Sequence, residues 1–283
     1  MISAVIKDED FIAQVRKYES DQKSFHVWWL GQSGYLLLWQ GKKVLIDPYL
    51  SDSLTKKYAA TNKPHVRICE RVVDPGMLYD ISIVSSSHNH TDHLDAETLI
   101  PVLAHNRNIT FIIPEANRSF VANRVQIDNS FPVGLNEGSS VNVGDFRFYG
   151  IPAAHNAIDR DENGQCLYLG YIIQFGAFTI YHSGDTLWYD GLEKQLAPFH
   201  IDLALLPING HDPLRGVAGN LNAKEAVELA KAVAIKHVIP CHYDMFTFNT
   251  ANPADFSNHA ELLQQAYSVL PVGGHWSSDM LKV

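Results

Sequence analysis

Apolar positions along the chain follow two different periods. Near the start, Phe11, Ile12 and Val15 recur at helical spacing behind several acidic residues, which favour a helix N-terminus. Downstream, apolar runs of strand length are separated by Gly31-Gln32-Ser33-Gly34 and Gly41-Lys42, the pattern of a meander of strands joined by tight turns. The chain therefore combines helices and strands from its first residues.

The same two periods predict the remaining elements in alternation. Helices are expected at 8–20, 96–105, 115–123, 187–196, from Asn222 onward and at 258–270, and strands at 25–30, 35–40, 43–47, 81–84, 109–113, within 141–151, and at 166–175, 178–181, 202–208 and 238–241. Asn222 with Glu225 matches a capping box, which fixes that helix start. The polar stretch 48–75 is too long for a structureless loop, so we expect it to be functional or partly helical.

Strand groups mixed with helices throughout predict an α/β arrangement, in which two packed sheets carry helices on their outer faces. With 283 residues, 46% of them hydrophobic, the chain can bury a large core, and we interpret residues 1–283 as a single domain.

Charge, hydropathy and cysteine content limit the classes of binding partner and the cellular compartment that we expect. A formal net charge of -9 argues against nucleic acid, since binding a phosphate backbone needs a basic face. The most apolar run, 166–181, contains Gln174 and falls short of the roughly 18 to 20 residues that cross a bilayer, so no membrane span is expected. The first residues lack the pattern of a secretory signal, and three cysteines without paired spacing indicate a reducing compartment, so we expect a cytoplasmic protein. The sequence is compatible with a homo-oligomer and does not determine the oligomeric state.

The candidate chemistry is concentrated in the segment His88-Asn89-His90-Thr91-Asp92-His93, directly after an apolar strand. A lone buried histidine is usually structural, whereas three imidazoles and a carboxylate within six residues predict a metal site. In a short extended turn, His88 and His90 share one side while Asp92 and His93 point toward a second position. This segment could therefore contribute ligands to two metal ions.

Three further ligand-type residues, His155, Asp185 and His242, each follow an apolar run that ends in a turn. Cys241 precedes His242, and because adjacent strand side chains point to opposite faces, we expect Cys241 to face the core.

This series resembles the metallo-β-lactamase superfamily, whose signature is an H-x-H-x-D-H loop followed by a later His, Asp and His. The resemblance implies a four-layer αββα sandwich covering nearly the whole chain, with the site at one edge between the sheets. It also implies that one metal is bound by His88, His90 and His155, that a second is bound by Asp92, His93 and His242, and that Asp185 bridges them. Asp92 and Asp185 are then the catalytic carboxylates.

A narrower likeness points to the L-ascorbate-6-phosphate lactonase group. It is carried by four stretches: Trp28-Trp29-Leu30-Gly31, Tyr181-His182-Ser183-Gly184-Asp185, Ile201-Asp202-Leu203-Ala204-Leu205, and Asn222-Ala223-Lys224 leading to Val238-Ile239-Pro240. We carry over the family from this likeness and not the ascorbate substrate.

The expected reaction is hydrolysis of a lactone or other ester bond in a small anionic substrate. Two divalent ions, zinc or manganese, would lower the pKa of bound water to about 7 and polarise the oxygen of the scissile group. Two alternatives stay open: a phosphodiesterase with the same ligands, and a non-catalytic module in which metal only stabilises the fold. Redox di-iron proteins of this fold usually carry Glu where this chain has His90.

Several residues are candidates for supporting roles. Asp47, before Pro48, is expected to hold the second ring N–H of a ligand histidine, or otherwise to cap a turn. His182 and His211 are proton donors or substrate contacts if they face the pocket, and ordinary hydrogen-bonded histidines if they do not. An anionic group of the substrate is expected to contact Arg215 or the basic residues of the long polar stretch, for which a solvated loop face is the alternative: Lys56, Lys57, Lys63, Arg67 and Arg71.

Overall fold

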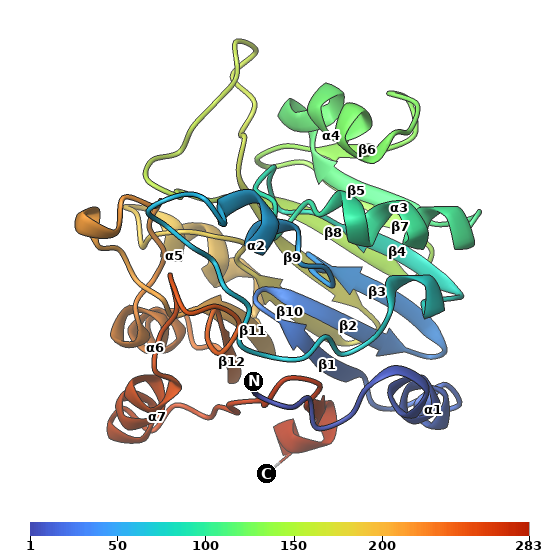
Figure 1. The fold of residues 1–283 in the computed structure, drawn as a ribbon. Helices are drawn as coiled ribbons and strands as arrows, with labels where there is room; N and C mark the ends of the chain where they lie inside the picture. The colour runs from blue at the N-terminus through green and yellow to red at the C-terminus, as the bar shows by residue number, and fades with distance from the viewer. Residues whose placement is uncertain (283) are drawn as a thin grey trace.

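Two β-sheets packed face to face form the centre of the computed structural model, which describes residues 1–282 (Figure 1). In strand order, the first sheet consists of β13 (His275–Ser277), β1 (His26–Gly31), β2 (Gly34–Trp39), β3 (Lys42–Ile46), β4 (Ile81–Ser85), β5 (Thr110–Pro114) and β6 (Val133–Leu135). The second consists of β12 (His237–Cys241), β11 (Leu203–Pro207), β10 (Phe178–His182), β9 (Leu169–Phe175), β8 (Phe146–Pro152) and β7 (Ser140–Val143).

Helices cover the outer faces of the sheets. They are α1 (Asp8–Tyr18), α2 (Ser53–Tyr58), α3 (Ala96–His105), α4 (Arg118–Val125), α5 (Leu192–Leu196), α6 (Ala223–Ala232) and α7 (Pro253–Leu262). Short 3₁₀ turns are η1 (Pro75–Met77), η2 (Glu115–Asn117), η3 (Ala197–Phe199), η4 (Pro213–Arg215) and η5 (Ser278–Lys282).

Helix α6 packs on β11, β12 and α7, while α1 lies near β1 on the other side of the molecule (Figure 1). This confirms the expected αββα arrangement. Within residues 1–282, every helix is too short or too polar to traverse a bilayer.

Strand direction brings the ends of several strands to one edge. Strands β3 and β4 pair in parallel, as do β10, β11 and β12. Strand β8 is antiparallel to β9, and β9 is antiparallel to β10, so β8 runs in the same direction as β10. Because parallel strands end at the same edge, the segments that follow β8, β10 and β12 leave the second sheet together. The Tyr171 hydroxyl in β9 donates to the Ser86 carbonyl, 2.8 Å away, and so joins this edge to the segment that follows β4.

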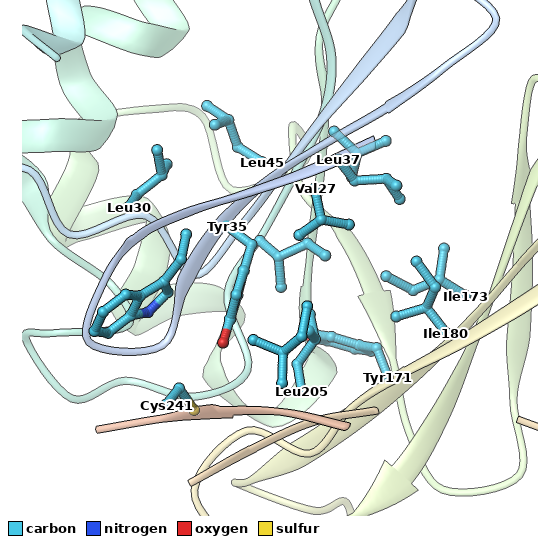
Figure 2. Packing of buried hydrophobic residues seen from close by; sticks show 14 of the residues in the cluster. Val27, Leu30, Tyr35, Leu37, Leu45, Tyr171, Ile173, Ile180, Leu205 and Cys241 are labelled. Atoms are coloured by element: carbon cyan, nitrogen blue, oxygen red, sulfur yellow. The ribbon is translucent and has the colours of Figure 1, made fainter. Parts of the chain in front are cut away.

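The apolar core lies between the sheets, and a second apolar layer lies under the helices. Figure 2 shows Val27, Tyr35 and Leu37 of the first sheet meeting Ile173 and Leu205 of the second. Trp28, which follows Val27 in β1, contacts Phe11 of α1, with the ring centroids 6.3 Å apart. Strands buried on both faces need apolar side chains at consecutive positions, which explains the unbroken apolar runs in β1 and β2.

The sequence pattern misplaced the last long helix. We expected it at 258–270, whereas α7 spans Pro253–Leu262. The Asn252 side chain caps its start by accepting a hydrogen bond from the Ala254 N–H, and proline at the next position suits a first helical turn. The local capping signal therefore outweighed the apolar period that extends beyond Leu262.

Other differences concern short elements. The three-residue strands β6 and β13 were not predicted, because neither is long enough to show a period. Helix α5 begins only at Leu192, after Gly191 with φ +95°, instead of at 187. Within 48–75, α2 confirms the expectation that this stretch is partly helical.

The start of α6 provides a stability test. The Asn222 Oδ1 accepts a hydrogen bond from the Glu225 N–H and the Glu225 Oε2 accepts one from the Asn222 N–H, each at 2.9 Å. We predict that Asn222→Ala lowers the free energy of unfolding by about 1 kcal/mol, whereas Asn222→Asp, which keeps the acceptor, does not. Urea unfolding followed by circular dichroism measures both, and equal midpoints for wild type and Asn222→Ala would rule out a stabilising cap.

Candidate metal centre

Four strands deliver the ligand-type residues to the shared edge. The segment 88–93 follows β4, His155 follows β8, Asp185 follows β10 and His242 follows β12. At two of these exits the backbone turns through the left-handed region, with φ +58° at Gly184 and +64° at His242. Gly184 has no room for a side chain, because a Cβ there would lie 2.7 Å from the Leu169 carbonyl and 2.9 Å from the Ser87 Cβ. This close approach places Asp185 beside the segment 88–93.

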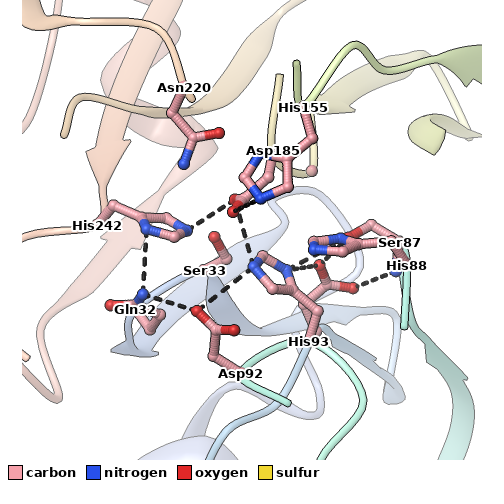
Figure 3. Close-up of polar contacts among 12 residues, drawn as sticks. Gln32, Ser33, Ser87, His88, Asp92, His93, His155, Asp185, Asn220 and His242 are labelled. Carbon is pink, nitrogen blue, oxygen red and sulfur yellow. Dashed lines mark hydrogen bonds and ion pairs between the residues drawn. The ribbon is translucent and has the colours of Figure 1, made fainter. Parts of the chain in front are cut away.

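All seven predicted ligands come together, and they do so in overlapping groups of three. The groups whose possible ligand atoms lie within 4.8 Å of one another are His88, His90 and His155; Asp92, His93 and His242; and His88, His93 and Asp185. The first two groups have the membership that the resemblance implied for two separate ions. In Figure 3, six of the seven point toward one shared space: His88, Asp92, His93, His155, Asp185 and His242.

Asp185 lies at the centre of this arrangement. Its Oδ1 is 2.8 Å from the His242 Nε2 and 3.3 Å from the His93 Nε2, and its Oδ2 is 3.5 Å from the His155 Nε2 (Figure 3). One carboxylate therefore contacts imidazoles from both groups. This is the placement required of a bridging ligand.

The buried polar atoms at this centre fit a metal. Four of them are buried and have no hydrogen-bond partner among the described residues: His88 Nε2, His93 Nε2, His242 Nε2 and Asp185 Oδ1. The contacts of Asp185 with His93 and His242 are short enough for ion pairs but do not align as hydrogen bonds. Buried polar atoms are almost always satisfied in folded proteins, so nitrogen and oxygen lone pairs converging on one point indicate a divalent cation.

Burial determines the protonation state of the first group of three, His88, His90 and His155. Desolvation lowers the pKa of His88 well below its ordinary value, lowers the pKa of His90 to about 4, and also lowers the pKa of His155. These imidazoles are therefore neutral at pH 7, the form that binds metal.

His93 differs from the first group. Burial would lower its pKa, but the nearby carboxylates of Asp185 and Asp92 outweigh burial and raise it well above the ordinary value. The carboxylates of Asp92 and Asp185 therefore favour a positive charge on or beside His93.

Asp47 holds one ligand from behind. It is fully buried at the end of β3, and its Oδ2 lies 2.6 Å from the Nδ1 of His93. The same carboxylate accepts hydrogen bonds from the backbone N–H and the hydroxyl of Ser87, and the Ser87 Oγ is 3.0 Å from the Nδ1 of His88. These contacts leave the Nε2 atoms of His88 and His93 facing the centre. Support of metal ligands by Asp47 stays a prediction.

Gln32 is a contact that sequence reasoning missed. The segment Gly31-Gln32-Ser33-Gly34 was interpreted as a hairpin turn, and it does join β1 to β2. The buried Gln32 side chain also reaches the second group: its Nε2 donates to the Asp92 Oδ2, 2.9 Å away, and lies 3.1 Å from the His242 Nδ1 (Figure 3). No local signal could reveal this, because the partners lie 60 and 210 residues away in sequence.

A cavity of about 240 Å³ opens above the ligands. Its lining includes four of the seven ligands, His90, Asp92, His155 and Asp185. Thr91, between two of these ligands in sequence, also lines it. The remainder comes from three segments far apart in sequence: Leu54, Lys57 and Tyr58 of α2 with Lys63 and His65 of the following loop; Gly216, Val217 and Ala218; and Asn249. A small molecule could enter this cavity, and the predicted metal ligands form part of its wall.

Neither His182 nor Arg215 lines the cavity. His182 is buried outside the cavity, and its ring nitrogens lie 3.0 Å from the Ser33 carbonyl and 3.3 Å from the Gly184 N–H, so backbone groups occupy both. The Arg215 guanidinium donates to the carbonyls of Asn209 and Gly210 and to the side chain of Asn249. Arg215 therefore orders the loop beside the cavity instead of lining the cavity.

Two other residues are placed as follows. His211 is exposed and outside the cavity lining, with its ring against Gly219, so a role in substrate binding stays a prediction. Cys241 faces the apolar core, as expected, and burial raises the pKa of its thiol (Figure 2).

Replacing Gln32 tests whether its side chain holds the second group. Because Gln32 has φ +51°, glycine suits its backbone, and Gln32→Gly removes the side chain without adding strain. We predict that one of two bound ions is held about 10 to 100 times more weakly, while the other, bound by residues that Gln32 does not touch, keeps its affinity. Calorimetric metal titration with elemental analysis measures this. Thermal unfolding of the metal-free variant is the control for folding, and two ions bound with wild-type affinity would contradict the prediction.

Comparison with known proteins gives the family. The profile described as the beta-lactamase superfamily domain matches residues 42–243, a range that contains all seven ligands. A UPF0173 metal-dependent hydrolase from Rubrobacter xylanophilus is 30% identical over 229 residues, which are 79% of this chain and 83% of the relative.

Two solved structures illustrate the fold. Isothiocyanate hydrolase from Delia radicum gut bacteria superposes with a TM-score of 0.70 at 18% identity, covering 89% of this chain and 98% of that one. CmlA, a diiron beta-hydroxylase from Streptomyces venezuelae, superposes with a TM-score of 0.67 at 13% identity, covering 91% of this chain and 54% of that one. At such identities the likeness shows the fold alone. The profile match and the identity to the Rubrobacter relative establish more: the chain belongs to the metallo-β-lactamase superfamily and is one of its metal-dependent hydrolases.

Proposed function

We propose that this protein is a dinuclear metal-dependent hydrolase that cleaves a lactone or other ester bond in a small anionic substrate. His88, His90 and His155 would hold one ion. Asp92, His93 and His242 would hold the second, and Asp185 would be shared between them. Zinc and manganese suit a site made of imidazoles and carboxylates.

The observation that carries the proposal is the overlap between the ligand set and the cavity. Structural metal sites are closed shells, whereas here four ligands form part of the wall of an open cavity of about 240 Å³. A substrate in this cavity would lie directly against the metal ligands. This argues against a module in which metal only stabilises the fold.

Paired divalent ions, when bound, lower the pKa of water to about 7 and polarise the oxygen of the scissile group. The chain's own residues would position the reactants. Asp92 and Asp185 both line the cavity, so their carboxylates would lie beside the reacting water, orient it and accept its proton. The outer contacts of Asp47 and Gln32 would keep the ligand side chains fixed during the reaction.

The ester or lactone class rests on the likeness to the L-ascorbate-6-phosphate lactonase group and on the small cavity. A phosphodiesterase would use the same seven ligands. The isothiocyanate hydrolase neighbour acts on a third type of bond within a similar fold. A substrate panel must therefore include all of these classes.

Metal removal followed by a substrate panel tests the function. We expect protein reloaded with zinc or manganese to hydrolyse simple lactones and 4-nitrophenyl esters at least tenfold faster than bis(4-nitrophenyl) phosphate or an isothiocyanate. Chelated protein should be inactive, because no side chain replaces the metal as activator of water. A higher rate on the phosphodiester would favour the phosphodiesterase, and no hydrolysis of any class would favour the metal-stabilised module.

Single ligand substitutions test the assignment to two groups. We predict that His155→Ala and His242→Ala each bind one ion instead of two and hydrolyse the best ester of the panel at least 100-fold more slowly, because each leaves an incomplete group. Elemental analysis and steady-state kinetics measure this. His105→Ala is the matched control, since His105 is exposed at the end of α3, and the assignment would be wrong if either ligand variant kept two ions.

A further inference from the structure

The basic residues of the stretch 56–71 divide into two classes. Three of them pair with carboxylates: Lys56 with Glu97 at 2.8 Å, Arg67 with Asp52 at 2.9 Å and Arg71 with Asp74 at 3.0 Å. For the other two, Lys57 and Lys63, no carboxylate of the described residues lies within ion-pair distance. The unpaired residues of this stretch are thus both lysines.

These two lysines line the cavity above the metal ligands. Lys57 lies at the end of α2, and its Nζ donates to the hydroxyl of Thr91, 3.2 Å away, between the ligands His90 and Asp92. Lys63 lies in the next loop, and its Nζ donates to the carbonyl of Gly216, which also lines the cavity. An ammonium group has three N–H donors, so each lysine keeps donors free for a bound molecule.

Neither lysine forms an ion pair with a carboxylate of the cavity lining. Those carboxylates are Asp92 and Asp185, and both face imidazoles of the metal centre. The chain as a whole carries a net charge of -9, so a concave region with two unpaired lysines contrasts with the rest of the surface. Such a region concentrates small anions. The solvated loop face expected for basic residues describes Lys56 and Arg71 better than Lys57 and Lys63.

We propose that Lys57 and Lys63 form the anion-binding part of the substrate site and bind a carboxylate or phosphate group at the mouth of the cavity. The remainder of the substrate then extends toward Asp185. This inference rests on the proposed function, because it assigns the cavity to substrate. It gives these lysines the role that the sequence suggested for Arg215, whose guanidinium donates to loop carbonyls and does not line the cavity.

A pair of esters that differ in one charged group tests the selectivity. Mono-4-nitrophenyl glutarate ends in a carboxylate where 4-nitrophenyl valerate ends in a methyl group. We expect Lys57→Ala and Lys63→Ala each to lower kcat/KM for the glutarate about tenfold, and to change kcat/KM for the valerate less than twofold, because a charge-assisted hydrogen bond is lost only with the charged ester. Lys56→Ala is the matched control, since Lys56 pairs with Glu97, and it should leave both values unchanged.

Binding of inorganic phosphate provides a readout that does not depend on hydrolysis. Calorimetry on metal-loaded protein should give about tenfold weaker phosphate binding for each lysine variant than for wild type or Lys56→Ala, and the metal contribution is common to all four proteins. Wild-type phosphate affinity and unchanged ester selectivity in both variants would overturn the anion site. Lysine-dependent phosphate binding without hydrolysis of any ester would instead overturn the proposed function and leave the anion site in place.

Discussion

The structure depends on the burial of the Asp185 carboxylate and several imidazole lone pairs at a single point. Asp185 and the Nε2 atoms of His88, His93 and His242 are buried and turned toward one another. Removing an ionised group from water costs several kcal/mol unless an opposite charge compensates it. The surrounding contacts of Asp47, Ser87 and Gln32 hold these atoms in place and leave the compensating charge to be supplied by a cation.

The need to direct side chains toward this buried point explains where residues other than glycine adopt positive φ. Asp47, Gln32 and His242 all adopt positive φ, which is rare for residues other than glycine. Each stands at the end of a strand or in the turn between two strands and directs a side chain toward the centre. Local strain of this kind persists only when surrounding structure enforces it, and here the packed sheets do so.

The sequence allowed the two-sheet architecture and the seven converging residues to be predicted, because both leave short-range signals. Apolar runs mark the strands, and the segment 88–93 places four ligands within six residues. The contact of Gln32 with Asp92 and His242 could not be predicted, since it depends on how distant turns meet. The separation of Lys57 from Lys56 was equally hidden: adjacent residues of one helix differ only because Glu97 of α3 lies beside one of them. The misplaced α7 is a different case, because Asn252 and Pro253 were visible as a helix start and the apolar period was given too much weight.

In the proposed function, substrate choice and metal binding depend on different parts of the molecule. The predicted ligands follow the ends of strands, whereas most of the remaining cavity lining comes from α2 with its following loop, from 216–218 and from Asn249. A hydrolase and a diiron hydroxylase both share this fold, so the framework itself does not determine the reaction. Loops can change their sequence without disturbing the ligands, and this division allows one framework to serve many substrates.

The membership of the ligand groups determines when the chain could bind metal during synthesis and folding. Each three-residue group assigned to a separate ion takes two ligands from the segment 88–93 and one from beyond residue 150, either His155 or His242. Neither half of the polypeptide can assemble such a group alone, so a nascent or fragmented chain offers only an incomplete chelator. Under the proposed assignment, metal binding would require that the two sheets have docked, and the bound ions would cross-link the two halves of the protein.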